Sequence, residues 1–95
     1  MNKIGYEERK AVYVSAIEKW GIDAQSCMAI EEMSELTKEI CKIRRGKNDP
    51  DALADEIADV TIMLEQLRLM FGMNELVCQH MDAKIARLKS RLGEA

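Results

Sequence analysis

Proline, histidine and aromatic residues are scarce in this sequence. One Pro, one His and four aromatic side chains occur among its 95 residues, together with five Gly. A lone His cannot supply the paired Glu-x-x-His motifs of a di-iron helical bundle. Because hydrophobic residues make up 47% and charged residues 33% of the chain, the composition is typical of one compact helical domain, spanning residues 1–95, rather than of a β-rich or disordered chain.

Long apolar runs and an excess of basic charge are also missing. No segment approaches the ~20 apolar residues that cross a bilayer, and positions 7–10 are charged where a signal peptide needs its apolar centre. The net charge of −3 gives no overall basic field to hold a nucleic-acid polymer. We therefore expect a cytoplasmic protein that binds neither a membrane nor a nucleic-acid polymer.

The cysteines offer no disulfide framework. Cys27, Cys41 and Cys78 are odd in number and form no CxxC pair. Cys27 and Cys41 would lie roughly 21 Å apart along one helix, at ~1.5 Å per residue, so they cannot bridge each other. Their apolar sequence surroundings predict buried free thiols in a reducing compartment.

Helical periodicity divides the chain into four predicted helices, at about 6–20, 23–45, 50–71 and from 74 onward. Asp23, Asp49 and Asn74 are the expected N-caps, and a Gly follows each of the first three helices. Because the connection between the second and third helices is only a few residues long, these two helices should pack antiparallel. The predicted fold is all-α, an antiparallel four-helix bundle-like domain.

The last predicted helix carries a narrow apolar seam. Met81, Ile85, Leu88 and Leu92 follow one another at spacings of three and four residues. Such a seam needs a partner helix, either in the same chain or in a second copy. A domain of this size has a modest core of its own, so we expect it to oligomerise through its helix faces.

Two pairs of carboxylates flank the predicted turn between the second and third helices. Glu32 and Glu35 form one pair, and Glu56 and Asp59 form the other. Residues at i and i+3 share a helix face, and the hairpin brings the two faces together. Glu56 falls inside an apolar stripe, where an unpaired carboxylate is strongly unfavourable without a cation, a hydrogen bond or a proton. All-oxygen ligation favours Mg²⁺, with Mn²⁺ as a substitute.

Other interpretations apply to each feature taken alone. A single Glu-x-x-Glu pair is usually a solvated helix face. Lys38, Arg45 and Lys47 either complement the helix macrodipole near its C-terminus or neutralise the phosphates of a substrate. Trp20 is either a core or interface anchor or a platform on which a nucleobase stacks.

The motifs Glu31-Glu32-x-x-Glu35 and Glu56-x-x-Asp59 resemble the EExxE…ExxD signature of the MazG-like all-α nucleoside triphosphate pyrophosphohydrolases. The segments RRGKNDP and EIADVTIMLEQL resemble the short single-domain forms found in phages and prophages, and the likeness covers about residues 24–72. It implies that Glu32, Glu35, Glu56 and Asp59 bind Mg²⁺, with Glu31 assisting Glu32 in activating a water.

The resemblance also implies an activity and an assembly. The activity is Mg²⁺-dependent hydrolysis of a (d)NTP between its α and β phosphates, which yields (d)NMP and pyrophosphate. A homodimer or homotetramer would build active sites near its interfaces, and Lys84 and Arg87 of the final helix would contact substrate, although Asp82 stands where relatives carry Asn. The alternatives are a phosphoribosyl-ATP pyrophosphatase-like enzyme and a non-catalytic helical oligomerisation protein.

Overall fold

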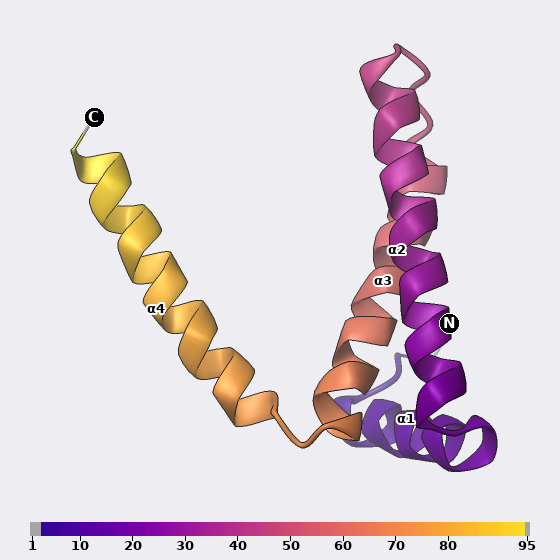
Figure 1. The fold of residues 1–95 in the computed structure, drawn as a ribbon. Coiled ribbons are helices and arrows are strands. Elements are labelled where there is room, and N and C mark those ends of the chain that lie inside the picture. The colour runs from indigo at the N-terminus through magenta and orange to yellow at the C-terminus, as the bar shows by residue number, and fades with distance from the viewer. Residues whose placement is uncertain (1–2, 95) are drawn as a thin grey trace.

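The computed structural model describes residues 3–94 as four helices: α1 Tyr6–Trp20, α2 Ile22–Arg44, α3 Pro50–Met70 and α4 Asn74–Gly93 (Figure 1). No strand occurs within this range. The all-α class predicted from the sequence is therefore confirmed. None of these helices is long and apolar enough to cross a membrane.

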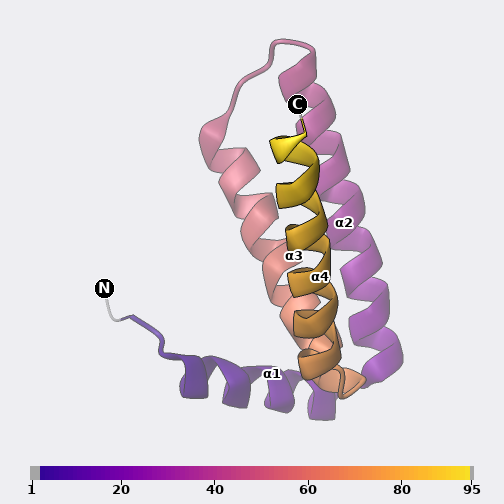
Figure 2. The same cartoon turned by 90° about the vertical axis from the view of Figure 1, so that its left-hand side faces the viewer.

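Helices α2 and α3 form the hairpin on which the remaining structure depends. The chain passes along α2, turns at residues 45–49, and returns beside it as α3 (Figures 1 and 2). As predicted, Asp49 caps α3: its Oδ1 accepts a hydrogen bond from the Ala52 N–H at 3.1 Å, and Pro50 opens the helix. Gly46 adopts the positive φ of 86° that the turn requires.

Two predicted N-caps are wrong. Helix α2 begins one residue before Asp23, because Gly21 both ends α1 and accepts the first backbone hydrogen bond of α2 from Gln25, at 3.1 Å. The Val77 N–H donates to the Met73 carbonyl at 2.9 Å, so Asn74 is the first residue of α4 and not its cap. Neither helix start has a side-chain cap.

The core lies where α1 crosses one end of the hairpin (Figure 2). Its buried apolar residues are Tyr13, Ala29, Val60 and Met63. Gln25 and Gln66 are buried among them, and the Gln25 Nε2 donates to the Gln66 Oε1 at 2.6 Å. This bond lets two polar side chains occupy the seam between α2 and α3.

Much of the predicted apolar surface is not covered within this chain. Ile30 and Ile40 of α2 and Leu64 of α3 are exposed, although each lies on a predicted apolar arc. All three cysteines are likewise free and exposed, so the prediction of buried thiols is wrong. Helical periodicity marks a face as apolar but does not say whether the same chain covers it.

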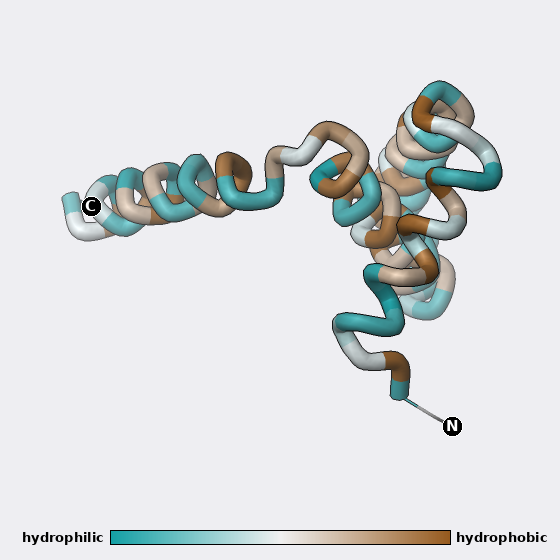
Figure 3. The backbone as a smooth tube through the Cα atoms, turned by 90° about the horizontal axis from the view of Figure 1, so that it is seen from below, coloured by the Kyte–Doolittle hydropathy of each residue, from teal (hydrophilic) through white to brown (hydrophobic). Residues whose placement is uncertain are grey.

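Helix α4 leaves the other three helices. Of the helices in residues 3–94 it contacts only α3, and it points away from the hairpin (Figures 1 and 3). Val77 is its one half-buried residue, whereas the seam residues from Met81 to Leu92 are exposed, the last by 70%. No helix of residues 3–94 covers the seam, so a bundle of all four helices and oligomerisation stay predictions.

Candidate metal centre

Three carboxylates of the predicted set come together across the hairpin. Glu32 of α2 meets Glu56 and Asp59 of α3, and one oxygen from each lies within 4.8 Å of the other two. All three residues are half-buried. The i, i+3 spacing places Glu56 and Asp59 on one face of α3, and the hairpin returns that face to Glu32. The arrangement offers hard oxygen ligands from two helices to one cation.

Glu56 is the least satisfied member of this acidic cluster, defined as Glu32, Glu56 and Asp59. Its Oε2 is buried and has no hydrogen-bond partner. Burial raises the pKa of Glu56 above its ordinary value, and the neighbouring charge of Asp59 raises it further. Burial also raises the pKa of Glu32, followed by the charge and hydrogen bond of Asp59. A cation bound here would favour the ionised form of both carboxylates.

No Lys or Arg within residues 3–94 forms an ion pair with the acidic cluster. Within residues 3–94, the two ion pairs are Lys42–Glu39 at 3.2 Å and Arg9–Glu65 at 3.5 Å, and neither includes the acidic cluster. A buried oxygen without a hydrogen-bond donor, beside two further carboxylates, is the environment that a divalent cation would relieve.

Glu35 and Glu31 lie outside the acidic cluster. Both are exposed, whereas the three residues of the cluster are half-buried. The charge of Glu35 still contributes to raising the pKa of Glu56, after burial and Asp59, and Glu31 acts similarly on Glu32. The structure thus gathers three of the four predicted metal ligands, with Glu35 beside them.

The predicted phosphate contacts are exposed and lie in two regions of the chain. Lys38, Arg45 and Lys47 lie at the hairpin end of α2 and in the turn, and none is in an ion pair with the described residues. Lys84 and Arg87 lie on α4, which points away from the hairpin (Figure 1). In a single chain, α4 does not bring these two residues to the acidic cluster.

An apolar cavity of about 620 Å³ lies beside the core, between α1, α2 and α3. Trp20 lines its rim and is 59% exposed, with the Lys19 ammonium 5.5 Å from the centre of its ring. Gln25 and Gln66 also line the cavity and are only 6% and 5% exposed. A volume of this size is within the range of small-molecule sites.

The Gln25–Gln66 pair was not predicted from the sequence, although its spacing from the acidic residues indicates a shared helix face. Gln25 lies seven residues before Glu32, and Gln66 lies seven residues after Asp59. Seven residues are two helical turns, about 10.5 Å, so the amide pair and the acidic cluster follow the same seam between α2 and α3. A polar residue at a core-facing heptad position, repeated on both helices, was the available signal.

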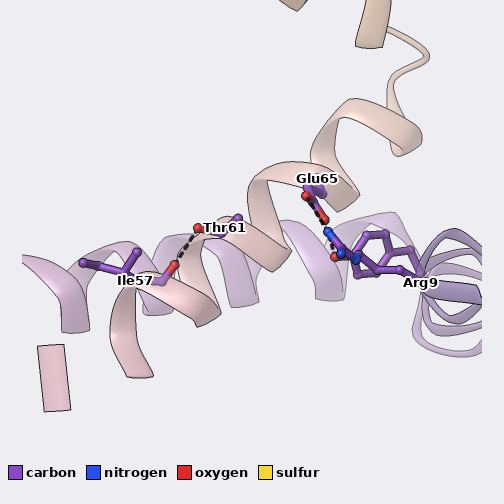
Figure 4. Close-up of polar contacts among 5 residues, drawn as sticks. Arg9, Ile57, Thr61 and Glu65 are labelled. Carbon is purple, nitrogen blue, oxygen red and sulfur yellow. Dashed lines mark hydrogen bonds and ion pairs between the residues drawn. The ribbon is translucent and has the colours of Figure 1, made fainter. Parts of the chain in front are cut away.

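A second polar cluster joins α1 to α3. Figure 4 shows Glu65 of α3 facing Arg9 of α1, while the Thr61 hydroxyl donates to the Ile57 carbonyl at 2.7 Å. The Tyr13 hydroxyl also donates to Glu65. Burial, then the hydrogen bond and charge of Glu65, raise the pKa of Tyr13 to about 12, so this phenol stays a donor at neutral pH.

Searches of family models, curated proteins and solved structures found no match to this chain.

Proposed function

We propose that this protein is a Mg²⁺-dependent nucleoside triphosphate pyrophosphohydrolase, which cleaves a (d)NTP between its α and β phosphates. The observation that carries the proposal is the buried, unpartnered Oε2 of Glu56 within the acidic cluster. The raised pKa values of Glu32 and Glu56 show that folding disfavours their ionised forms, so the arrangement does not serve stability. Groups with shifted pKa values are concentrated at functional sites. The resemblance of the two motifs to MazG-like enzymes gives the reaction class.

In this proposal Glu32, Glu56 and Asp59 hold Mg²⁺, and Glu35 joins them by a change of side-chain rotamer on the adjacent turn. Bound Mg²⁺ would neutralise charge on the phosphates and lower the pKa of a water molecule. Glu31, on the exposed side of Glu32, orients that water toward the α phosphorus. Lys38 lies six residues beyond Glu32, about 9 Å along α2, and is the nearest of the predicted basic residues to the remaining phosphate oxygens. Arg45 and Lys47 lie farther along the hairpin, Arg45 about 20 Å from Glu32, and would serve the site of a second copy.

The apolar cavity gives the proposed substrate a place for its base. Its lining runs along α3 from Ala58, the neighbour of Asp59, to Gln66, about 10.5 Å beyond Asp59 along the helix axis, which suits the length of one nucleoside. Trp20 offers a ring for stacking at the rim. The buried amides of Gln25 and Gln66 offer polar groups within its mainly apolar wall.

A homodimer or homotetramer completes the proposal. The exposed seam of α4 is the surface through which a second copy would pack, in an antiparallel bundle made by two chains. Lys84 and Arg87 flank that seam, so packing would carry them toward a partner's hairpin. The apolar area left exposed on a chain of this size supports self-association.

The test is a panel of canonical and modified NTPs and dNTPs with Mg²⁺, together with phosphoribosyl-ATP, assayed for pyrophosphate and orthophosphate separately. We expect pyrophosphate, and we expect Glu56→Gln to lower its release about 100-fold or more, because a metal ligand contributes several kcal/mol to the transition state. Glu18→Gln, an exposed carboxylate of α1, is the matched control. Full activity of the Glu56 variant would remove the metal centre from the mechanism.

The exposed face of α4 specifically favours a second candidate, a non-catalytic helical oligomerisation protein. Melting temperature in a Mg²⁺ titration separates the two, since an ion that binds only the folded state stabilises it. A metal centre predicts a rise that Glu56→Gln removes and Glu18→Gln retains. An oligomerisation protein without an ion site predicts no rise.

A further inference from the structure

A second cavity, of about 350 Å³, lies where α1 passes the end of α3 and the start of α4. Three cationic side chains, Arg9, Lys10 and Arg68, line it with one carboxylate, Glu65. The whole chain carries a net charge of −3. A concave surface with this local excess of positive charge, in an acidic protein, attracts anions selectively to one place.

Arg68 is the residue of this basic cavity that lacks a strong acceptor. Its Nε is buried and has no hydrogen-bond partner. Its Nη2 donates to the Cys78 Sγ at 3.1 Å, and a thiol sulfur is only a weak acceptor. A guanidinium reaches its best pairing with the paired oxygens of a phosphate or carboxylate. The Nε and Nη2 groups form one edge of the Arg68 guanidinium, and the described residues satisfy this edge poorly.

Glu65, the one carboxylate that lines the basic cavity, already interacts with Tyr13 and Arg9. The Tyr13 hydroxyl donates to one oxygen of Glu65, and the Arg9 Nη1 lies 3.5 Å from the other. Lys10 and Arg68 form no ion pair among residues 3–94. The structure therefore leaves two cations in one cavity for an incoming anion.

We propose that the basic cavity, lined by Arg9, Lys10 and Arg68, binds a phosphoryl group, either free phosphate or the phosphate of a small monoester. Arg68 forms the paired hydrogen bonds, and Lys10 supplies a second charge at the mouth of the cavity. The ligand is a dianion, which two unpaired cations neutralise. Arg9 keeps its pairing with Glu65 and borders the site.

This site is distinct from the acidic cluster in charge and in position. Arg68 lies nine residues beyond Asp59 on α3, about 13.5 Å along the helix axis. Its cavity also includes Asn74, the first residue of α4. An anion bound there touches the last turn of α3 and the beginning of α4 together, and so restrains the direction in which α4 leaves the hairpin.

The test is a titration of the metal-free protein with inorganic phosphate in EDTA, at constant ionic strength, followed by amide chemical shifts. We expect saturable shifts gathered around residues 9, 10, 68 and 74. Arg68→Gln should weaken binding about tenfold or more through loss of charge-assisted hydrogen bonds. Lys10→Gln should weaken it several-fold, and it changes a fully exposed residue, which keeps the test valid if Arg68→Gln misfolds.

Arg91→Gln is the matched control, because it removes the same charge from an exposed position on α4. Unchanged affinity in this variant supports the site. Absent saturation, or an equal loss in Arg91→Gln and Lys10→Gln, would overturn it.

Two further titrations answer separate questions. The first distinguishes a nucleotide from free phosphate as the ligand, and the second tests whether the basic cavity is independent of the acidic cluster. A nucleoside monophosphate that binds more tightly than inorganic phosphate identifies a nucleotide as the ligand, whereas equal affinity identifies free phosphate. Glu56→Gln should bind phosphate as the unchanged protein does, since the basic cavity does not use the acidic cluster. Loss of phosphate binding in Glu56→Gln would contradict the separation of the two sites.

Discussion

The hairpin of α2 and α3 and the single helix α4 are built from similar amphipathic patterns and have different surroundings. In the hairpin, Ala29, Val60 and Met63 are buried between helices of the same chain. In α4, Ile85, Leu88 and Leu92 have comparable spacing and remain exposed. The turn at residues 45–49 returns α3 alongside α2, whereas the shorter turn at residues 71–73 directs α4 outward (Figure 1). Periodicity therefore specifies a helix, and the connection decides what covers it.

Introducing a charge into the exposed seam of α4 is expected to have the largest effect. Leu88→Lys is expected to raise the dissociation constant of the proposed oligomer about 100-fold or more, because it would bury an unpaired charge in an apolar interface. Light scattering after size exclusion should then report a mass near the 10.8 kDa of one chain. Ser90→Lys, on the opposite side of α4, should leave the mass unchanged. A monomeric unaltered protein would show instead that α4 tolerates exposure.

Replacing one residue of the Gln25–Gln66 pair should destabilise the hairpin of α2 and α3. Gln25→Ala leaves Gln66 buried without its 2.6 Å partner and is expected to cost about 1–3 kcal/mol of unfolding free energy. The paired replacement Gln25→Leu with Gln66→Leu should recover most of that loss, because no orphaned amide remains. Urea unfolding of the single and double variants measures the coupling, and strictly additive losses would count against it.

Tyr13→Phe should have a smaller effect, about 1 kcal/mol, through loss of one hydrogen bond to Glu65. The phenol's pKa is raised from its usual 10.0 to about 12. A raised folded-state pKa means that this stabilisation is fully present below pH 10 and is lost as pH rises toward 12. An ultraviolet titration of phenolate formation should show one late-ionising tyrosine that disappears in Tyr13→Phe.

The acidic cluster should give the mildest pH dependence. The pKa values of Glu32 and Glu56 are raised from 4.5 in the folded protein, so protonation stabilises the fold. That contribution is complete below pH 4.5 and declines as pH rises through the folded-state values. In EDTA, the melting temperature of Glu56→Gln should decline less over this interval than that of the unaltered protein. Identical profiles would show that Glu56 does not titrate as the geometry requires.

Helix positions and part of the candidate site were predictable because they follow from local rules. Asp49 and Pro50 mark the start of α3 by cap chemistry alone, and Glu56 stands out as a charge on an apolar stripe. The spacing of three residues and a tight turn then suffice to bring Asp59 and Glu32 to it.

The remaining features depend on contacts between helices, which local sequence patterns do not specify. Arg68 and Glu65 are unremarkable in the sequence, and their roles arise only where α1 crosses the hairpin. The burial of the cysteines failed as a prediction because it required neighbours that this chain does not place there. Asp23 failed as a cap because Gly21 had already begun the next helix.

Gly21 joins α1 to α2 with no other residue between the two helices, at a φ of 91°. One residue has only two soft backbone torsions, so Gly21 alone sets the direction of α1 relative to α2. Helix α1 carries Arg9 and Tyr13, which line both cavities. The torsions of Gly21 therefore help to shape both cavities, and a side chain at φ 91° and ψ 159° would cost about 1–3 kcal/mol, because this region is essentially restricted to glycine.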